Sequence, residues 1–211
     1  KEATEDQQKA EERINKIRIT GLSIFGALAA VATKFGSTID TIGKSFGSLT
    51  VMGEPFKNDL LASSVEATKL GGSMEDVASI TNTLASNFGM NVDEAAKLSS
   101  KVFDTSKALG ISGDEAANLF GTLMQTANLS ADQAEKLAEG AFQLARQAGV
   151  APSAVMKYIA GSAEEIALFT KDGGDNIAEA AVQARQMGLS LSTTAKVAEG
   201  LLDFENSVNK E

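Results

Sequence analysis

The sequence contains no cysteine and no histidine among its 211 residues. The absence of cysteine excludes disulfide bonds and thiolate chemistry. The absence of histidine removes the most common general base, and together the two absences remove the most common ligands of transition metals. Catalytic triads of the Ser-His and Cys-His types are therefore impossible. We expect no catalytic residue, no cofactor site and no metal site, and hence no enzymatic activity.

Acidic residues are the remaining candidates for catalysis. The adjacent pairs Glu75-Asp76, Asp114-Glu115 and Glu164-Glu165 could in principle serve as general acids and bases. Each pair lies where a helix is expected to begin, and carboxylates in a first turn cap free N–H groups and interact favourably with the helix dipole. This structural role explains the pairs better than catalysis does.

Aromatic residues and positive charge are also scarce. The chain has no tryptophan and one tyrosine, but 43% of its residues are hydrophobic, so it can bury a core made of Ala, Leu, Ile, Val and Phe. Such a core favours closely packed helices. The net charge of −9 argues against binding to a nucleic-acid backbone, which requires clustered Lys and Arg. No sequence-specific nucleic-acid binding is expected.

The sequence has no hydrophobic run long enough to span a bilayer as a helix. The apolar stretch Ile19–Thr33 covers 15 residues between Arg18 and Lys34, whereas a spanning helix needs about 20. No signal peptide is visible. The chain begins at Lys1 and stops within a charged, apparently helical stretch, so we interpret it as an excerpt of a longer protein.

The N-terminal third carries a seven-residue apolar pattern that is typical of coiled coils. An adjacent position adds further apolar residues and widens the stripe, which favours a bundle of three or more helices over a dimer. We expect residues 14–52 to self-associate, although the stripe could also fold back on the rest of the chain or meet another partner. The predicted oligomer interface consists of Ile14, Ile17, Ile24, Leu28, Val31, Phe35, Ile42, Leu49 and Met52.

Glycines interrupt this first segment and leave two alternatives open. Gly43 and Gly47 are spaced to allow close packing against another helix. The segment is either one continuous oligomeric helix or a buried hairpin that breaks near Gly36-Ser37. Gly53-Glu54-Pro55 ends it, because proline starts a helix more readily than it continues one. The expected domains are residues 1–53, a long amphipathic, coiled-coil-like helix, and residues 54–211.

A 39-residue register runs through the second domain, punctuated by Leu70-Gly71, Leu109-Gly110, Ala148-Gly149 and Met187-Gly188. Segments 71–109 and 110–148 match at ten positions, among them Ser73/Ser112 and Phe103/Phe142. A fixed period of this size indicates one supersecondary unit that is copied and stacked. We predict an all-α fold in which short helical hairpins form an array. The expected helix boundaries lie near Gly53, Gly71, Gly89, Gly110, Asn128, Gly149, Gly173 and Gly188.

Two stretches together carry a resemblance to a known family. Ile19–Ala30 is a Gly/Ala-rich amphipathic stretch after a charged segment, and Lys107–Ala116 (KALGISGDEA) exemplifies the repeated helix junctions. The chain resembles the tail tape-measure proteins of long-tailed bacteriophages over most of its length. The resemblance implies a structural virion protein inside the tail tube, largely helical and present in a few copies. It also implies that the protein's length sets tail length and that it leaves the tube when DNA is ejected.

The resemblance further implies other phage tail proteins as partners and possible contact with the host membrane on ejection. No part of the chain resembles the cell-wall-degrading segments of some family members. Two other functions remain open on the residues alone. The hairpin array could be an α-solenoid that binds a peptide, or residues 19–51 could form a membrane-active segment.

Overall fold

The computed structural model describes residues 26, 28–44, 53–162, 175–190, 193 and 196. Within these residues every regular element is an α-helix and none is a strand. The all-α prediction is therefore confirmed. The first described helical stretch, residues 28–44, is called the N-terminal helical segment below. It is followed by α2 (Glu54–Lys69), α3 (Met74–Phe88), α4 (Val92–Leu109), α5 (Gly113–Thr126), α6 (Ala131–Gln147), α7 (Pro152–Ala160) and α9 (Asp175–Gln186).

Three of the helices, α3, α5 and α6, begin at serine caps that the sequence encodes locally. Ser73, Ser112 and Ser130 each accept a hydrogen bond from the backbone N–H three residues on, and the side chain at that third position accepts one from the serine's own N–H. These reciprocal capping boxes satisfy two N–H groups that a helix otherwise leaves unpaired. Three helices start differently. The Asn91 side chain caps α4 by accepting a hydrogen bond from the Asp93 N–H, and α2 and α7 have proline in the first turn, at Pro55 and Pro152.

Most of the described helices end near a residue with a left-handed backbone, as the sequence predicted. An exception is α7, which ends before Gly161 with φ −90°, where no boundary was predicted. Gly71, Gly89, Gly110, Gly149 and Gly188 have φ between +64° and +79°, and Asn128 has φ +53°. After Gly110 the chain turns back, so that the Ile111 N–H donates to the Ser106 carbonyl at 3.0 Å. This geometry satisfies carbonyls at the helix end. The predicted boundary at Gly173 lies outside the described residues.

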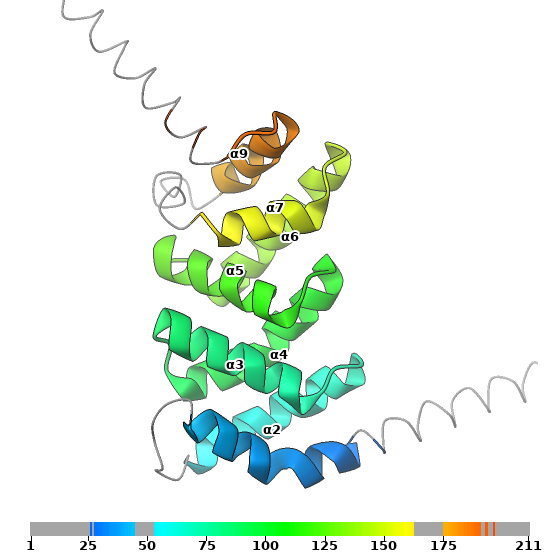
Figure 1. Ribbon diagram of the computed structural model, residues 1–211, viewed down its shortest axis with the longest axis vertical. Helices are drawn as coiled ribbons and strands as arrows, with labels where there is room; N and C mark the ends of the chain where they lie inside the picture. Colours follow the sequence, from blue (N-terminus) through cyan, green and yellow to red (C-terminus); the bar gives the residue numbers. More distant parts are fainter. Residues whose placement is uncertain are drawn as a thin grey trace, which may run out of the picture.

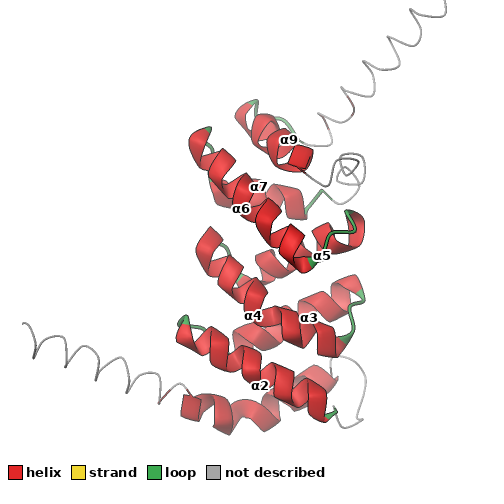
Figure 2. Ribbon diagram, turned by 180° about the vertical axis from the view of Figure 1, so that it is seen from behind, coloured by secondary structure: helices red, strands yellow, loops and turns green. Residues whose placement is uncertain are grey.

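The helices stack in two rows along the long axis of the molecule (Figures 1 and 2). One row contains the N-terminal helical segment, α3, α5 and α7, and the other contains α2, α4, α6 and α9. Consecutive helices within a row touch, and each helix also packs against a neighbour in the other row. One helix from each row therefore makes a layer, and the chain adds one layer after another.

The core lies between the rows and is built from small and aliphatic residues. Phe56, Phe103 and Phe120 are its largest fully buried or nearly buried side chains, and many alanines fill the space between helices. Buried hydroxyls are satisfied by backbone carbonyls: Ser63 on α2 donates to the Ala96 carbonyl of α4 at 2.7 Å. No buried side-chain polar atom of the described residues lacks a hydrogen-bond partner.

The N-terminal helical segment lies against the first helices of the stack. Its helix passes through Gly36 and Ser37 without interruption, so the predicted alternative of a break at that point is wrong. Val31 and Ile42 belong to the same buried cluster as the residues of α2 and α3. The described part of the predicted first domain therefore shares a core with the second domain.

Candidate functional site

Four of the predicted interface residues lie in the described helix, and the chain itself covers two of them. Val31 is 4% exposed and Ile42 is 3% exposed, with no other chain present. Phe35 is half-buried against the same core and Leu28 is half-exposed. In this conformation Val31 and Ile42 match the fold-back alternative and are not available to other copies. Gly43 is buried as well. The remaining predicted positions, Ile14, Ile17, Ile24, Leu49, Met52 and Gly47, lie outside the described residues.

An open groove runs between the N-terminal helical segment and α3. It has a volume of about 400 Å³, and a smaller cavity of about 110 Å³ lies beside it, next to the loop before α3. The contact between the two helices is therefore incompletely filled. The larger groove is lined mainly by residues with polar side chains, although much of the surface they present is apolar: Ser37, Thr38, Thr41, Ile42, Glu75, Ala78, Ser79 and Asn82.

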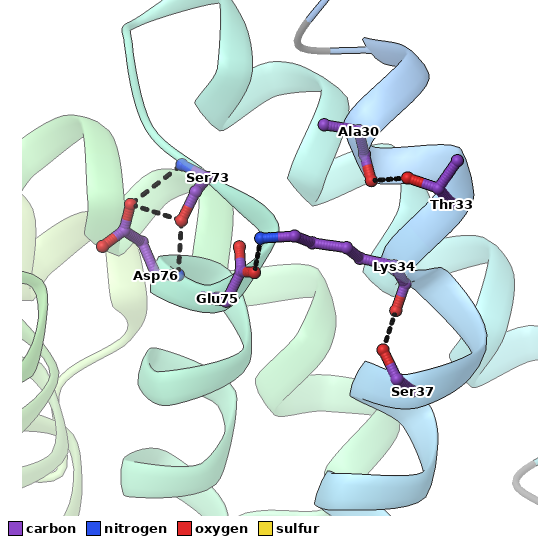
Figure 3. Close-up of polar contacts among 7 residues, drawn as sticks. All are labelled: Ala30, Thr33, Lys34, Ser37, Ser73, Glu75 and Asp76. Atoms are coloured by element: carbon purple, nitrogen blue, oxygen red, sulfur yellow. Dashed lines mark hydrogen bonds and ion pairs between the residues drawn. The ribbon is translucent and has the colours of Figure 1, made fainter.

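One ion pair crosses this contact. The Lys34 ammonium donates to a carboxylate oxygen of Glu75 at 2.5 Å, reaching from the N-terminal helical segment to the first turn of α3 (Figure 3). This hydrogen bond lowers the pKa of Glu75 below its ordinary value. Both side chains remain more than half exposed, so the pair fixes orientation more than it adds stability.

Ion pairs also cross the later junctions between layers. Lys101 of α4 binds both Asp132, at 2.5 Å, and Glu135 of α6, at 2.9 Å. Lys157 of α7 binds Glu115 of α5 at 2.8 Å. Hydrogen bonding to the carboxylates raises the pKa of Lys101, and the matching bonds from lysine lower the pKa values of Asp132 and Glu115. These groups therefore remain charged over a wide range around neutral pH.

A second groove, of about 510 Å³, opens between α4 and α6. Its apolar part is formed by Leu109 and the half-buried ring of Phe142, and the guanidinium of Arg146 lies 5.9 Å from that ring. The groove is lined by Ala108, Leu109, Lys136, Glu139, Gly140, Phe142 and Gln143. Its lining carries one lysine and one glutamate, which gives it no strong preference for either sign of charge.

Two of the three acidic pairs considered for catalysis, Glu75-Asp76 and Asp114-Glu115, occupy first turns, as predicted. Asp76 and Glu115 complete capping boxes, and Asp114 accepts a hydrogen bond from Ser79 at 2.7 Å. Glu164-Glu165 lies outside the described residues. Among the residues that the structure does describe, no three acidic side chains come together in a way that could hold a metal ion.

Sequence reasoning missed the contacts between layers. Lys34 and Glu75 are separated by 41 positions, and Lys101 and Asp132 by 31. No local pattern connects residues so far apart, because helix periodicity describes only one face of one element. The register did indicate that equivalent helices would be neighbours, but not which side chains would meet.

The described helices include none that is long and apolar enough to cross a membrane. A scan against protein-family models, a search of curated proteins and a search of solved structures each found no match.

Proposed function

We propose that this chain is a structural segment of a bacteriophage tail tape-measure protein, located inside the tail. The observation that carries the proposal is the stack itself, in which chain length is converted into added layers of helices. Repeat architectures of this kind set dimensions and bury surface, and each unit contacts mainly its neighbours. The repeated helix junctions, which resemble those of the tape-measure family, support the same conclusion.

The proposal includes a 39-residue repeat of helical hairpins. Two sets of helix starts support it: Met74, Gly113 and Pro152 in one row, and Val92 and Ala131 in the other, all at 39-residue steps. The left-handed glycines 71, 110, 149 and 188 follow the same step. A protein assembled from such units changes its dimensions in equal increments as units are added or removed.

The proposal also includes the N-terminal heptad helix over residues 14–52 and its self-association with other copies. Other tail proteins, and the host membrane during ejection, are the further partners that this role implies. The uninterrupted helix through Gly36 supports the continuous form of the segment.

The test is to delete residues 110–148 from the gene in a phage that encodes this chain. The deletion removes α5 and α6 together and joins Leu109 to Gly149, so a left-handed glycine still follows α4. We expect shorter tails in electron micrographs, and longer tails when the same unit is duplicated. Unchanged tail length in both variants, or the absence of the chain from purified particles by mass spectrometry, would contradict the proposal.

A second candidate is an α-solenoid that binds a peptide, and the open groove between α4 and α6 favours it. Ala108 is exposed at the edge of that groove. If this function is correct, peptides selected against the full chain from a display library should lose binding when Ala108→Arg blocks the groove. They should keep it when the exposed Ala62 of α2 is changed in the same way. Equal binding to both variants would argue against this candidate.

A further inference from the structure

The heptad stripe of the N-terminal helical segment has two competing uses. Its pattern is typical of helices that associate with other copies. In the structure, however, Val31 and Ile42 are buried in the core of their own chain. The same side chains cannot face another copy and this core at once. The surface that receives them therefore determines whether the segment is free to associate.

Part of that surface lies on α3 and is called the docking face below; it consists of Met74, Glu75, Ala78, Ser79 and Asn82. The surface continues onto Thr68 of α2 and Gly72 in the following loop, which line the smaller cavity beside Val31. The segment covers it incompletely. Of residues 28–44, only Val31, Thr38, Ile42 and Gly43 are buried. The two cavities lie along this contact, whereas contacts inside the stack, such as Phe103 against Gly72, are tight. The segment is thus held by an apolar contact of Val31 and Ile42, with Phe35 and Ile39 partly buried beside them, and by the exposed Lys34–Glu75 pair.

We infer that the docking face also accepts residues 28–44 of a second copy of this chain, so that two copies exchange their N-terminal helical segments. The second copy is the occupant that fits best, because its segment carries the same Val31, Ile42 and Lys34 that the face already binds. Exchange of an identical element forms a dimer at low cost, since the interactions that break within one copy form again between the two copies.

Concentration determines which form prevails. A tethered segment experiences an effective concentration of its own docking face that is on the order of millimolar for a short linker. The closed form, in which the segment binds the docking face of its own chain, therefore dominates in dilute solution. The exchanged dimer becomes populated as the protein concentration approaches that value. Confinement of several copies in one assembly would favour the exchanged form. The inference does not depend on the tape-measure role and holds for any setting that concentrates the chain.

The absence of cysteine makes this exchange directly measurable by cross-linking. We would prepare the full chain as Lys34→Cys and, separately, as Glu75→Cys with an isotope label. The two proteins are mixed at concentrations from about 10 μM to about 1 mM and treated with a short bis-maleimide. We expect a 34–75 link between labelled and unlabelled chains that increases steeply with concentration. The double variant should form the same link within one chain at every concentration.

The matched control replaces Glu75→Cys with Glu139→Cys, at an exposed position on α6. The Lys34→Cys and Glu139→Cys chains report links formed by random collision between molecules and should give little linked product. The exchange is refuted if the link between chains never exceeds this control while the double variant links internally. It is equally refuted if the chain forms a trimer or larger bundle without 34–75 links between copies. The heptad stripes of different copies would then contact one another and not the docking face.

A complementary pair of variants provides an independent test. Val31→Asp with Ile42→Asp disables the segment and leaves the docking face intact, whereas Ala78→Arg blocks the half-buried face and leaves the segment intact. In neither variant can the N-terminal helical segment bind the docking face of its own chain. In a 1:1 mixture, the intact segment of one variant should bind the intact docking face of the other and form a heterodimer at concentrations where wild type is monomeric. Using Ala62→Arg in place of Ala78→Arg should give no heterodimer. Monomers alone in the first mixture, with helical circular dichroism retained, would overturn the inference.

Discussion

Single residues determine how closely neighbouring helices approach. At Gly121 in α5, an added Cβ would lie 2.2 Å from the ring of Phe88, which is too close for two non-bonded carbon atoms. At Gly140 in α6, an added Cβ would meet nothing within 4 Å. The two glycines therefore have different roles, although both lie inside helices. One permits contact between α3 and α5, and the other only weakens its own helix.

We predict that Gly121→Ala destabilises the fold by about 1–3 kcal/mol, the usual cost of overfilling a packed contact. Gly140→Ala should instead be neutral or stabilise by up to about 1 kcal/mol, because alanine has the higher helix propensity. Urea unfolding followed by circular dichroism would compare the two midpoints. Equal midpoints would show that the ring of Phe88 moves aside and that the close approach has no energetic consequence.

Each helix depends on the chemistry at its ends. The Ser112 hydroxyl accepts a hydrogen bond from the Glu115 N–H at 3.2 Å, and the Glu115 carboxylate accepts one from the Ser112 N–H at 3.1 Å. Glu115 also binds Lys157 of the next layer. The start of α5 is thus connected to α7, so a defect in the cap affects a junction between layers as well as one helix.

We predict that Ser112→Ala lowers the free energy of unfolding by about 1 kcal/mol, within the range of about 0.5–2 kcal/mol for the removal of serine caps. Ser112→Asp should retain most of the stability, because aspartate also accepts the hydrogen bond from the helix N–H. The measurement is chemical denaturation of the three proteins side by side. A loss in the aspartate variant as large as in the alanine variant would indicate that the cap is not the source of the effect.

Most helix ends were predictable from the sequence because their determinants are local, whereas the end of α7 at Gly161, which has no left-handed residue, was not predicted. The boundary at Gly110 followed from a glycine, a hydrophobic residue and a serine in succession, and the backbone there is left-handed. Contacts between layers were not predictable in the same way. An apolar stripe such as Val31 with Ile42 must be buried against another surface, but the sequence pattern does not specify whether that surface belongs to another copy or to the same chain. The close approach of Gly121 to Phe88 likewise depends on the packing angle of two helices, which propensity does not determine.

Ion pairs recur from layer to layer along the described stack. Glu75, Glu115 and Asp132 each bind a lysine of a neighbouring layer, and in each case the hydrogen bond from lysine lowers the carboxyl pKa. A carboxyl group whose pKa is lower in the folded state stabilises the fold at pH values above its unfolded pKa. That stabilisation is lost as the pH falls through the folded pKa. Lys101, whose pKa is raised, loses its contribution only when the pH rises through the lysine range, above about 10.

We therefore predict a plateau of stability around neutral pH and a decline below about pH 4–5, where carboxyl groups take up protons.

The variant Glu75→Gln, Glu115→Gln, Asp132→Asn isolates the contribution of these pairs, because glutamine at position 115 can still complete the capping box. At pH 7 it should be less stable than wild type by a small margin, since the three carboxylate side chains are between one-third and three-quarters exposed to solvent. The difference in stability between the two proteins should shrink as the pH falls through the lowered pKa values of these carboxyl groups, and added salt should reduce the difference at pH 7 because it screens exposed charges. The measurement is urea unfolding from pH 3 to 8 at two salt concentrations. A gap that stays constant with pH would mean that the ion pairs between layers do not couple to folding, and that apolar contact alone holds the stack together.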